Sequence, residues 1–88
     1  ISEAEECLNQ AVALRPSEFK PVYNRGKLRL HTGDTEGALR DLDKATSLKP
    51  RHAGAHECFA DALMAAGKES EAALHYRLAE ELRKNKNN

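Results

Sequence analysis

Small and apolar residues recur along the chain at helical spacing, and short segments that contain glycine or proline interrupt them. In residues 2–15, Ala4, Leu8 and Ala11 lie three or four positions apart, which places them on one face of a helix. Ser2 precedes this stripe and has the side chain of a helix N-cap. The pattern therefore predicts a helix that packs one face against a neighbour.

The same periodicity continues along the chain, with a regular series of breaks. Pro16 and Pro50 cannot continue a helix, whereas Gly33 and Gly67 can adopt the left-handed conformation that ends one. β-branched and aromatic residues nowhere alternate as they do in strands. The predicted fold class is therefore all-α, with five helices over residues 2–15, 20–32, 35–48, 53–66 and 69–83.

An interval of 34 residues relates these helices to one another. Pro16 returns as Pro50, and Ala11 returns as Ala45 and then as Ala79. A period of this length indicates one supersecondary unit that is stacked on copies of itself, because a single unit cannot bury its own apolar face. The connections are short, so consecutive helices are expected to be antiparallel neighbours.

The residues that recur also carry a resemblance to a known family. They are Tyr23, Asn24, Arg25, Gly26, Gly33, Asp34, Ala38, Leu42, Ala45 and Pro50. This pattern resembles the tetratricopeptide repeat, and the resemblance implies antiparallel helix-turn-helix repeats stacked into a right-handed solenoid. It also implies close helix packing at two small residues, Gly26 against Ala38 and Ala60 against Ala72. The sequence departs from the family pattern at Arg29, His56 and Lys84.

The repeat register divides the chain into one partial and two complete units. Residues 1–16 are the second helix of a truncated repeat, 17–50 and 51–84 are full repeats, and 85–88 are a polar tail. We expect further repeats upstream. The last helix has Glu80 where the preceding repeat has Thr46, and Ala73 where it has Leu39. A more polar outer face of this kind is typical of a capping unit.

Charge and cysteine content narrow the classes of function. The chain has 14 basic and 14 acidic residues, so it lacks the basic footprint of a nucleic-acid binder and the polybasic attraction to anionic membranes. No apolar run is long enough to span a membrane. Cys7 and Cys58 occupy unrelated repeat positions and do not form a disulfide framework. We therefore expect an intracellular, cytoplasmic protein.

In the resembled family, the first helix of each repeat lines a concave groove, and this implies a set of inward-facing positions. They hold Lys20, Tyr23, Asn24, Lys27, Leu30, His31, Gly54, Glu57, Cys58, Asp61, Met64 and Ala65. The candidate ligand-binding residues among them are Lys20, Tyr23, Asn24, Lys27, His31, Glu57 and Asp61. A solvated polar face without a ligand remains the alternative. The family's clamp for a terminal carboxylate is not supported, because Gly54 and Cys58 replace its basic residues.

The sequence gives little support for a metal site or a catalytic group. His52 and His56 are four residues apart, but His52 follows a proline in a loop and no third metal ligand accompanies them. Cys58 has His56 and Asp61 nearby in sequence, yet residues two apart on a helix do not face each other. We therefore expect neither an enzyme nor a metal site nor a cofactor.

The sequence thus predicts a scaffold that binds a peptide or a helix of another protein on the concave face. The alternative is a structural or self-associating end of a longer array. Exposed apolar residues of the first helix, Ala4 and Leu8, lead us to expect weak homodimerisation through that helix. Neither nucleic acid nor a membrane is an expected partner.

Overall fold

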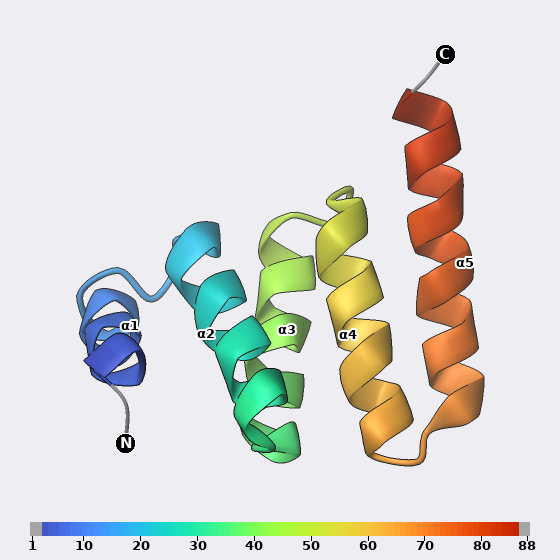
Figure 1. The fold of residues 1–88 in the computed structure, drawn as a ribbon. Helices are drawn as coiled ribbons and strands as arrows, with labels where there is room; N and C mark the ends of the chain where they lie inside the picture. Colours follow the sequence, from blue (N-terminus) through green and yellow to red (C-terminus); the bar gives the residue numbers. More distant parts are fainter. Residues whose placement is uncertain (1–2, 87–88) are drawn as a thin grey trace.

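The computed structural model describes residues 3–86, and these form five α-helices arranged in a row (Figure 1). The helices span Glu3–Leu14 (α1), Phe19–Thr32 (α2), Thr35–Leu48 (α3), Ala53–Ala65 (α4) and Glu69–Lys86 (α5). No strand occurs within residues 3–86. The two ends of the chain lie at opposite ends of the row (Figure 1). The predicted all-α architecture is confirmed.

Helix boundaries agree closely with the sequence pattern except at the two ends of the chain. The predicted N-cap, Ser2, lies outside the described residues, as do residues 87–88 of the predicted polar tail. α5 continues to Lys86 instead of ending at Arg83. No glycine or proline interrupts this stretch, and Lys84 pairs with Glu80 one turn earlier, at 3.5 Å.

Glycines in the left-handed conformation make two of the turns. Gly33, with φ of 92°, follows α2, and Gly67, with φ of 80°, precedes α5. Asp34 then caps α3, because its side-chain oxygen accepts a hydrogen bond of 3.0 Å from the backbone N–H of Gly37. These are the breaks that the sequence predicts.

Small residues allow the paired helices to approach each other. Ala60 is fully buried in a cluster with Leu63 and Ala72, which confirms its predicted contact. At Gly26, a Cβ atom would lie only 2.8 Å from Cγ of Leu42. A side chain at this position would therefore collide with Leu42 and Asp41, and the predicted contact of Gly26 with Ala38 stays a prediction.

A polar network joins the first three helices. Arg25 donates two hydrogen bonds to the carboxylate of Asp41, of 2.8 and 2.7 Å, and a third of 3.2 Å to the side-chain oxygen of Asn9. Arg29 donates to the same carboxylate at 3.2 Å. Arg29 departs from the usual aromatic of the resembled family, and the structure shows that its charge is matched by Asp41. The network fixes how α1, α2 and α3 sit together.

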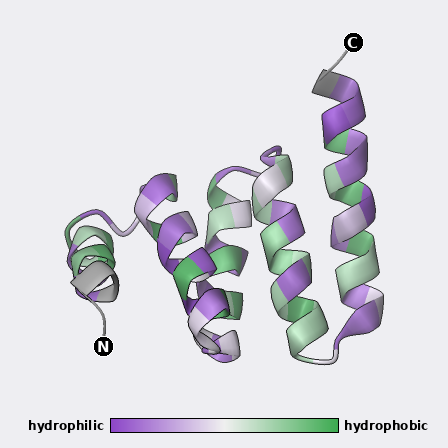
Figure 2. Ribbon diagram, in the orientation of Figure 1, coloured by the Kyte–Doolittle hydropathy of each residue, from purple (hydrophilic) through white to green (hydrophobic). Residues whose placement is uncertain are grey.

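The outer face of α5 differs from the prediction. Glu80 is exposed, as expected, but Leu74, Tyr76 and Leu78 are also 64%, 37% and 37% exposed. Hydrophobic and hydrophilic turns consequently alternate along this helix (Figure 2). The expected polar capping face rested on Ala73 and Glu80, which are both exposed, but the leucines lie outside the stripe that packs on α4 and add apolar surface beside them.

We predict that Asp41→Ala lowers the free energy of unfolding by about 3 kcal/mol, because it leaves two largely buried guanidinium groups without their shared carboxylate. Urea unfolding followed by circular dichroism measures this loss. Glu80→Ala is the matched control: its pair with Lys84 is exposed, so the change should be below about 0.5 kcal/mol. Equal losses in the two variants would contradict the role given to Asp41.

Candidate functional site

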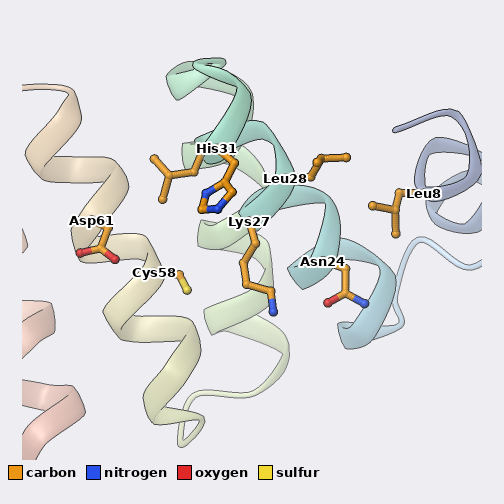
Figure 3. A pocket seen from close by; sticks show the side chains of 8 residues that line it. Leu8, Asn24, Lys27, Leu28, His31, Cys58 and Asp61 are labelled. Carbon is orange, nitrogen blue, oxygen red and sulfur yellow. The ribbon is translucent and has the colours of Figure 1, made fainter. Parts of the chain in front are cut away.

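An open groove of about 470 Å³ lies between α1, α2 and α4. Figure 3 shows that its side chains come from all three helices. The lining residues are Leu8, Asn24, Lys27, Leu28, Leu30, His31, Cys58 and Asp61.

Helix periodicity places these residues in the groove. Asn24, Lys27 and His31 lie three or four positions apart on α2 and therefore share a face. The opposite face of α2 carries Val22 and Gly26, which are buried against the neighbouring helices. Burial of that apolar face leaves the polar face of α2 turned into the groove.

Leucines give the groove an apolar wall. Leu8 of α1 and Leu28 of α2 point toward each other (Figure 3), and Leu30 of α2 also lines the groove. Leu8 is half-buried, whereas its counterpart one repeat later, Leu42, is fully buried. The groove therefore offers apolar contact area beside the amide of Asn24 and the ammonium group of Lys27.

Tyr23 is not among the lining residues of the groove but contacts two of them, Lys27 and Cys58. Its ring stacks on Phe19 with 5.0 Å between centroids, and its hydroxyl lies 3.7 Å from Sγ of Cys58. The Lys27 ammonium group sits 4.5 Å from the centroid of the Tyr23 ring, a cation–π contact. Burial, followed by the contact with Cys58, raises the pKa of Tyr23 to about 12, so the phenol stays neutral at physiological pH.

The two acidic candidate residues, Glu57 and Asp61, accept hydrogen bonds from side chains of α5. Arg83 donates a hydrogen bond of 2.7 Å to Glu57, and the hydroxyl of Tyr76 donates to Asp61. This bond to Asp61 is the main reason that the pKa of Tyr76 is raised to about 12. The acidic side of the groove is therefore already paired with groups of the same chain.

The structure brings together four of the seven candidate residues predicted from the sequence. Asn24, Lys27, His31 and Asp61 line the groove, and Leu30 and Cys58, from the wider inward-facing set, join them. The lining given by the described residues does not include Lys20, Tyr23 or Glu57. Lys20 is exposed in the first turn of α2.

Sequence reasoning missed Leu8 and Leu28 as lining residues. Leu28 could have been found, because it is four residues after Asn24 and shares its helix face. Leu8 was assigned to the repeat's packing stripe, and nothing in the sequence separates that role from a place on the groove wall. The contributions of Arg83 and Tyr76 were also missed, since neither belongs to a groove helix.

The histidines and cysteines have separate partners. Nδ1 of His52 accepts a hydrogen bond from the N–H of Ala55 and caps α4, while His56 contacts Pro50 and His75. Within the described part of the chain, no three His, Cys, Asp or Glu side chains form a cluster suited to a metal ion. Cys58 contacts Tyr23, not His56, so the nucleophile and base of a catalytic group are not brought together.

Comparison with known proteins identifies the family. A family model described as tetratricopeptide repeat matches residues 1–46 and again residues 23–87. The chain belongs to the tetratricopeptide repeat family. Among solved structures, the crystal structure of MamA superposes with a TM-score of 0.85 and 24% sequence identity, over 93% of this chain and 48% of that chain. At this identity the likeness shows the fold alone.

The chain spans about half the length of the MamA chain that it matches, 48%. No curated protein matches the sequence significantly. In the described residues, no helix has both the length and the apolar character needed to cross a membrane.

We predict that iodoacetamide alkylates Cys7 faster than Cys58 at pH 7.5. Cys7 is exposed, whereas Cys58 is partly buried, and burial is the largest cause of its raised pKa, which lowers the fraction of reactive thiolate. Mass spectrometry of tryptic peptides over a time course measures both rates. A Cys7→Ser variant should lose the fast phase, and a fast phase that persisted in this variant would contradict the buried placement of Cys58.

Proposed function

We propose that this chain is a protein-interaction scaffold that binds a short peptide segment or helix of another protein in the groove between α1, α2 and α4. Tetratricopeptide repeats and the solenoid fold support a scaffold role in general. One observation carries the specific proposal. Asn24, Lys27 and His31 converge on an open groove whose wall is apolar, while the acidic residues Glu57 and Asp61 are paired with α5.

This arrangement revises the chemistry of the expected ligand. The sequence led us to expect a ligand with charges of both signs. In the structure, Arg83 and Tyr76 occupy the acidic groups, so the polar groups that face the groove from α2 are an amide, an ammonium group and an imidazole. An extended segment with a carboxylate beside an apolar side chain fits them best. The amide of Asn24 can both donate to and accept from its backbone.

The proposal also covers the repeat boundaries, the mode of action and the cellular compartment of the chain. We infer that residues 17–50 and 51–84 are its two complete repeats, and that it acts by binding and not by catalysis. The thiols of Cys7 and Cys58 are free in the structure, which supports placement in a reducing intracellular compartment.

A second candidate is a structural or self-associating role. The exposure of Leu74 and Leu78 on α5 favours it, because exposed apolar side chains at helical spacing promote association. Weak dimerisation through α1, where Leu8 is half-buried, also stays a prediction. Under this alternative, changes in the groove would leave all interactions of the protein intact.

Selection from a random peptide library displayed on phage, with the purified chain as bait, tests the groove. We expect selected peptides to lose at least several-fold in affinity for an Asn24→Ala/Lys27→Ala double variant, while the free energy of unfolding changes by less than about 0.5 kcal/mol per exposed site. Affinity is measured by fluorescence anisotropy.

The matched control is Arg40→Ala/Lys44→Ala. Both residues are exposed on α3, which contributes no lining residue to the groove, so this variant should bind the peptides unchanged. Peptides that bind the groove variant as tightly as the unmodified chain would overturn the proposal and favour the structural role.

A further inference from the structure

Two histidines, His56 of α4 and His75 of α5, face each other across the contact between these helices. Their Nδ1 atoms are 3.1 Å apart, and their rings stack at 17° with 5.3 Å between centroids. His56 is only 5% exposed, and its Nε2 lies 2.7 Å from the carbonyl oxygen of Pro50. His75 also packs edge-on against Phe59.

The hydrogen-bonding partners fix where the protons lie. A carbonyl oxygen only accepts, so Nε2 of His56 carries a proton and donates it to Pro50. In the neutral pair, Nδ1 of His56 is then an acceptor, and Nδ1 of His75 donates to it. A first additional proton can bind to Nε2 of His75 and leave this bond intact. A second would place an N–H on both Nδ1 atoms and remove the acceptor.

The preceding repeat has different residues at the positions that form this contact. His75 stands 34 residues after Asp41, and Phe59 and Leu63 stand where that repeat has Arg25 and Arg29. At these repeat positions α2 and α3 are joined by an arginine–carboxylate network, whereas α4 and α5 have a pair of histidines, the side chain that serves as a proton switch. The contact between α4 and α5 should thus be more sensitive to mild acid than the contact between α2 and α3.

Charged groups around the pair favour one proton and oppose two. Burial is the largest effect on His75 and lowers its pKa below the usual 6.5, and the adjacent His56 lowers it further. Glu71 on α5 and Asp43 on α3 act in the opposite direction. The carboxylates can offset a single positive charge, but two imidazolium rings in stacked contact repel each other.

We propose that the His56–His75 pair is a proton-operated latch that holds α5 on α4, and that uptake of the second proton releases α5. Release also withdraws Arg83 and Tyr76 from Glu57 and Asp61. The groove would then expose its acidic side and favour ligands of mixed charge. This last consequence rests on the proposed function of the groove, whereas the release of α5 does not.

The direction of the pH dependence follows from proton counting. With α5 detached, the pKa of His75 returns to its usual 6.5 and each ring is free to take up a proton in mild acid, while the docked pair can hold only one and keep the hydrogen bond between its Nδ1 atoms. The docked state is therefore fully stable above pH 6.5 and loses stability as the pH falls below it. One excess proton in the released state raises the equilibrium constant for release about tenfold per pH unit.

Hydrogen exchange measured by mass spectrometry between pH 7.5 and 5 tests the latch and requires no ligand. After correction for the intrinsic pH dependence of exchange, we expect amide protection in α5 to fall about tenfold per pH unit below 6.5, while protection in α2 and α3 is unchanged. Uniform protection of α5 across this range would overturn the latch and leave the groove proposal untouched.

Two variants and one spectrum complete the test. His56→Val introduces the residue that the preceding repeat has at this position, Val22, and should abolish the acid-dependent loss in α5. His31→Gln, at an exposed site, should retain it. In nitrogen-15 spectra of the unmodified chain, the docked pair should take up one proton only. Independent uptake of two protons with α5 still protected would refute the proposal.

Discussion

The fold depends on the close contact between α2 and α3. Each helix in the row can bury its apolar face only against its neighbours, so an error at one contact cannot be compensated elsewhere. At this contact, the absence of a side chain on Gly26 makes room for Leu42, which is fully buried. The carboxylate of Asp41 then binds two arginines of α2 beside it. Together these interactions set the rotation of α2, and with it the direction in which Asn24 and Lys27 point.

The sequence was sufficient for the helices and for most of the groove face of α2. A repeat of 34 residues, with glycine and proline at its breaks, leaves little freedom in helix number or order. The family resemblance implied the inward-facing positions, and helix periodicity placed Asn24, Lys27 and His31 on one face. The departures from the family pattern at Arg29 and His56 did not predict the contacts of these residues. A single unusual residue does not reveal its partner, which is Asp41 for Arg29 and His75 for His56.

The side-chain contacts between α4 and α5 could not be predicted from the sequence. Arg83 and Glu57 are 26 residues apart, and the reach of a long side chain between two helices follows no sequence period. The same holds for the bond between Tyr76 and Asp61. These contacts pair Glu57 with a positive charge and give Asp61 a hydrogen-bond donor from the same chain. The exposed leucines of α5 were also not predicted. The comparison of Ala73 and Glu80 with the preceding repeat gives no information on the exposure of Leu74 and Leu78.

The last helix thus links the fold to the proposed function. α5 completes the stack by packing Ala72 and Ala79 into the core, and it also places Arg83 against Glu57 and Tyr76 against Asp61 of the groove helix α4. Its contact with α4 combines the buried cluster of Ala60, Leu63 and Ala72 with the pair of His56 and His75 and the ion pair of Arg83 with Glu57. The composition of the groove and the stability of α5 are therefore coupled through a single helix contact.

Chemical-shift mapping tests the central claim, that the groove is the ligand-binding surface. A peptide selected for binding to the chain is titrated into the isotopically labelled protein, and the perturbed amide and side-chain signals are assigned. The account predicts that the largest changes fall on the groove residues Asn24, Lys27, His31 and Cys58. Changes confined to the outer surface, at Arg40, Lys44 and Leu74, with the groove signals unmoved, would contradict it.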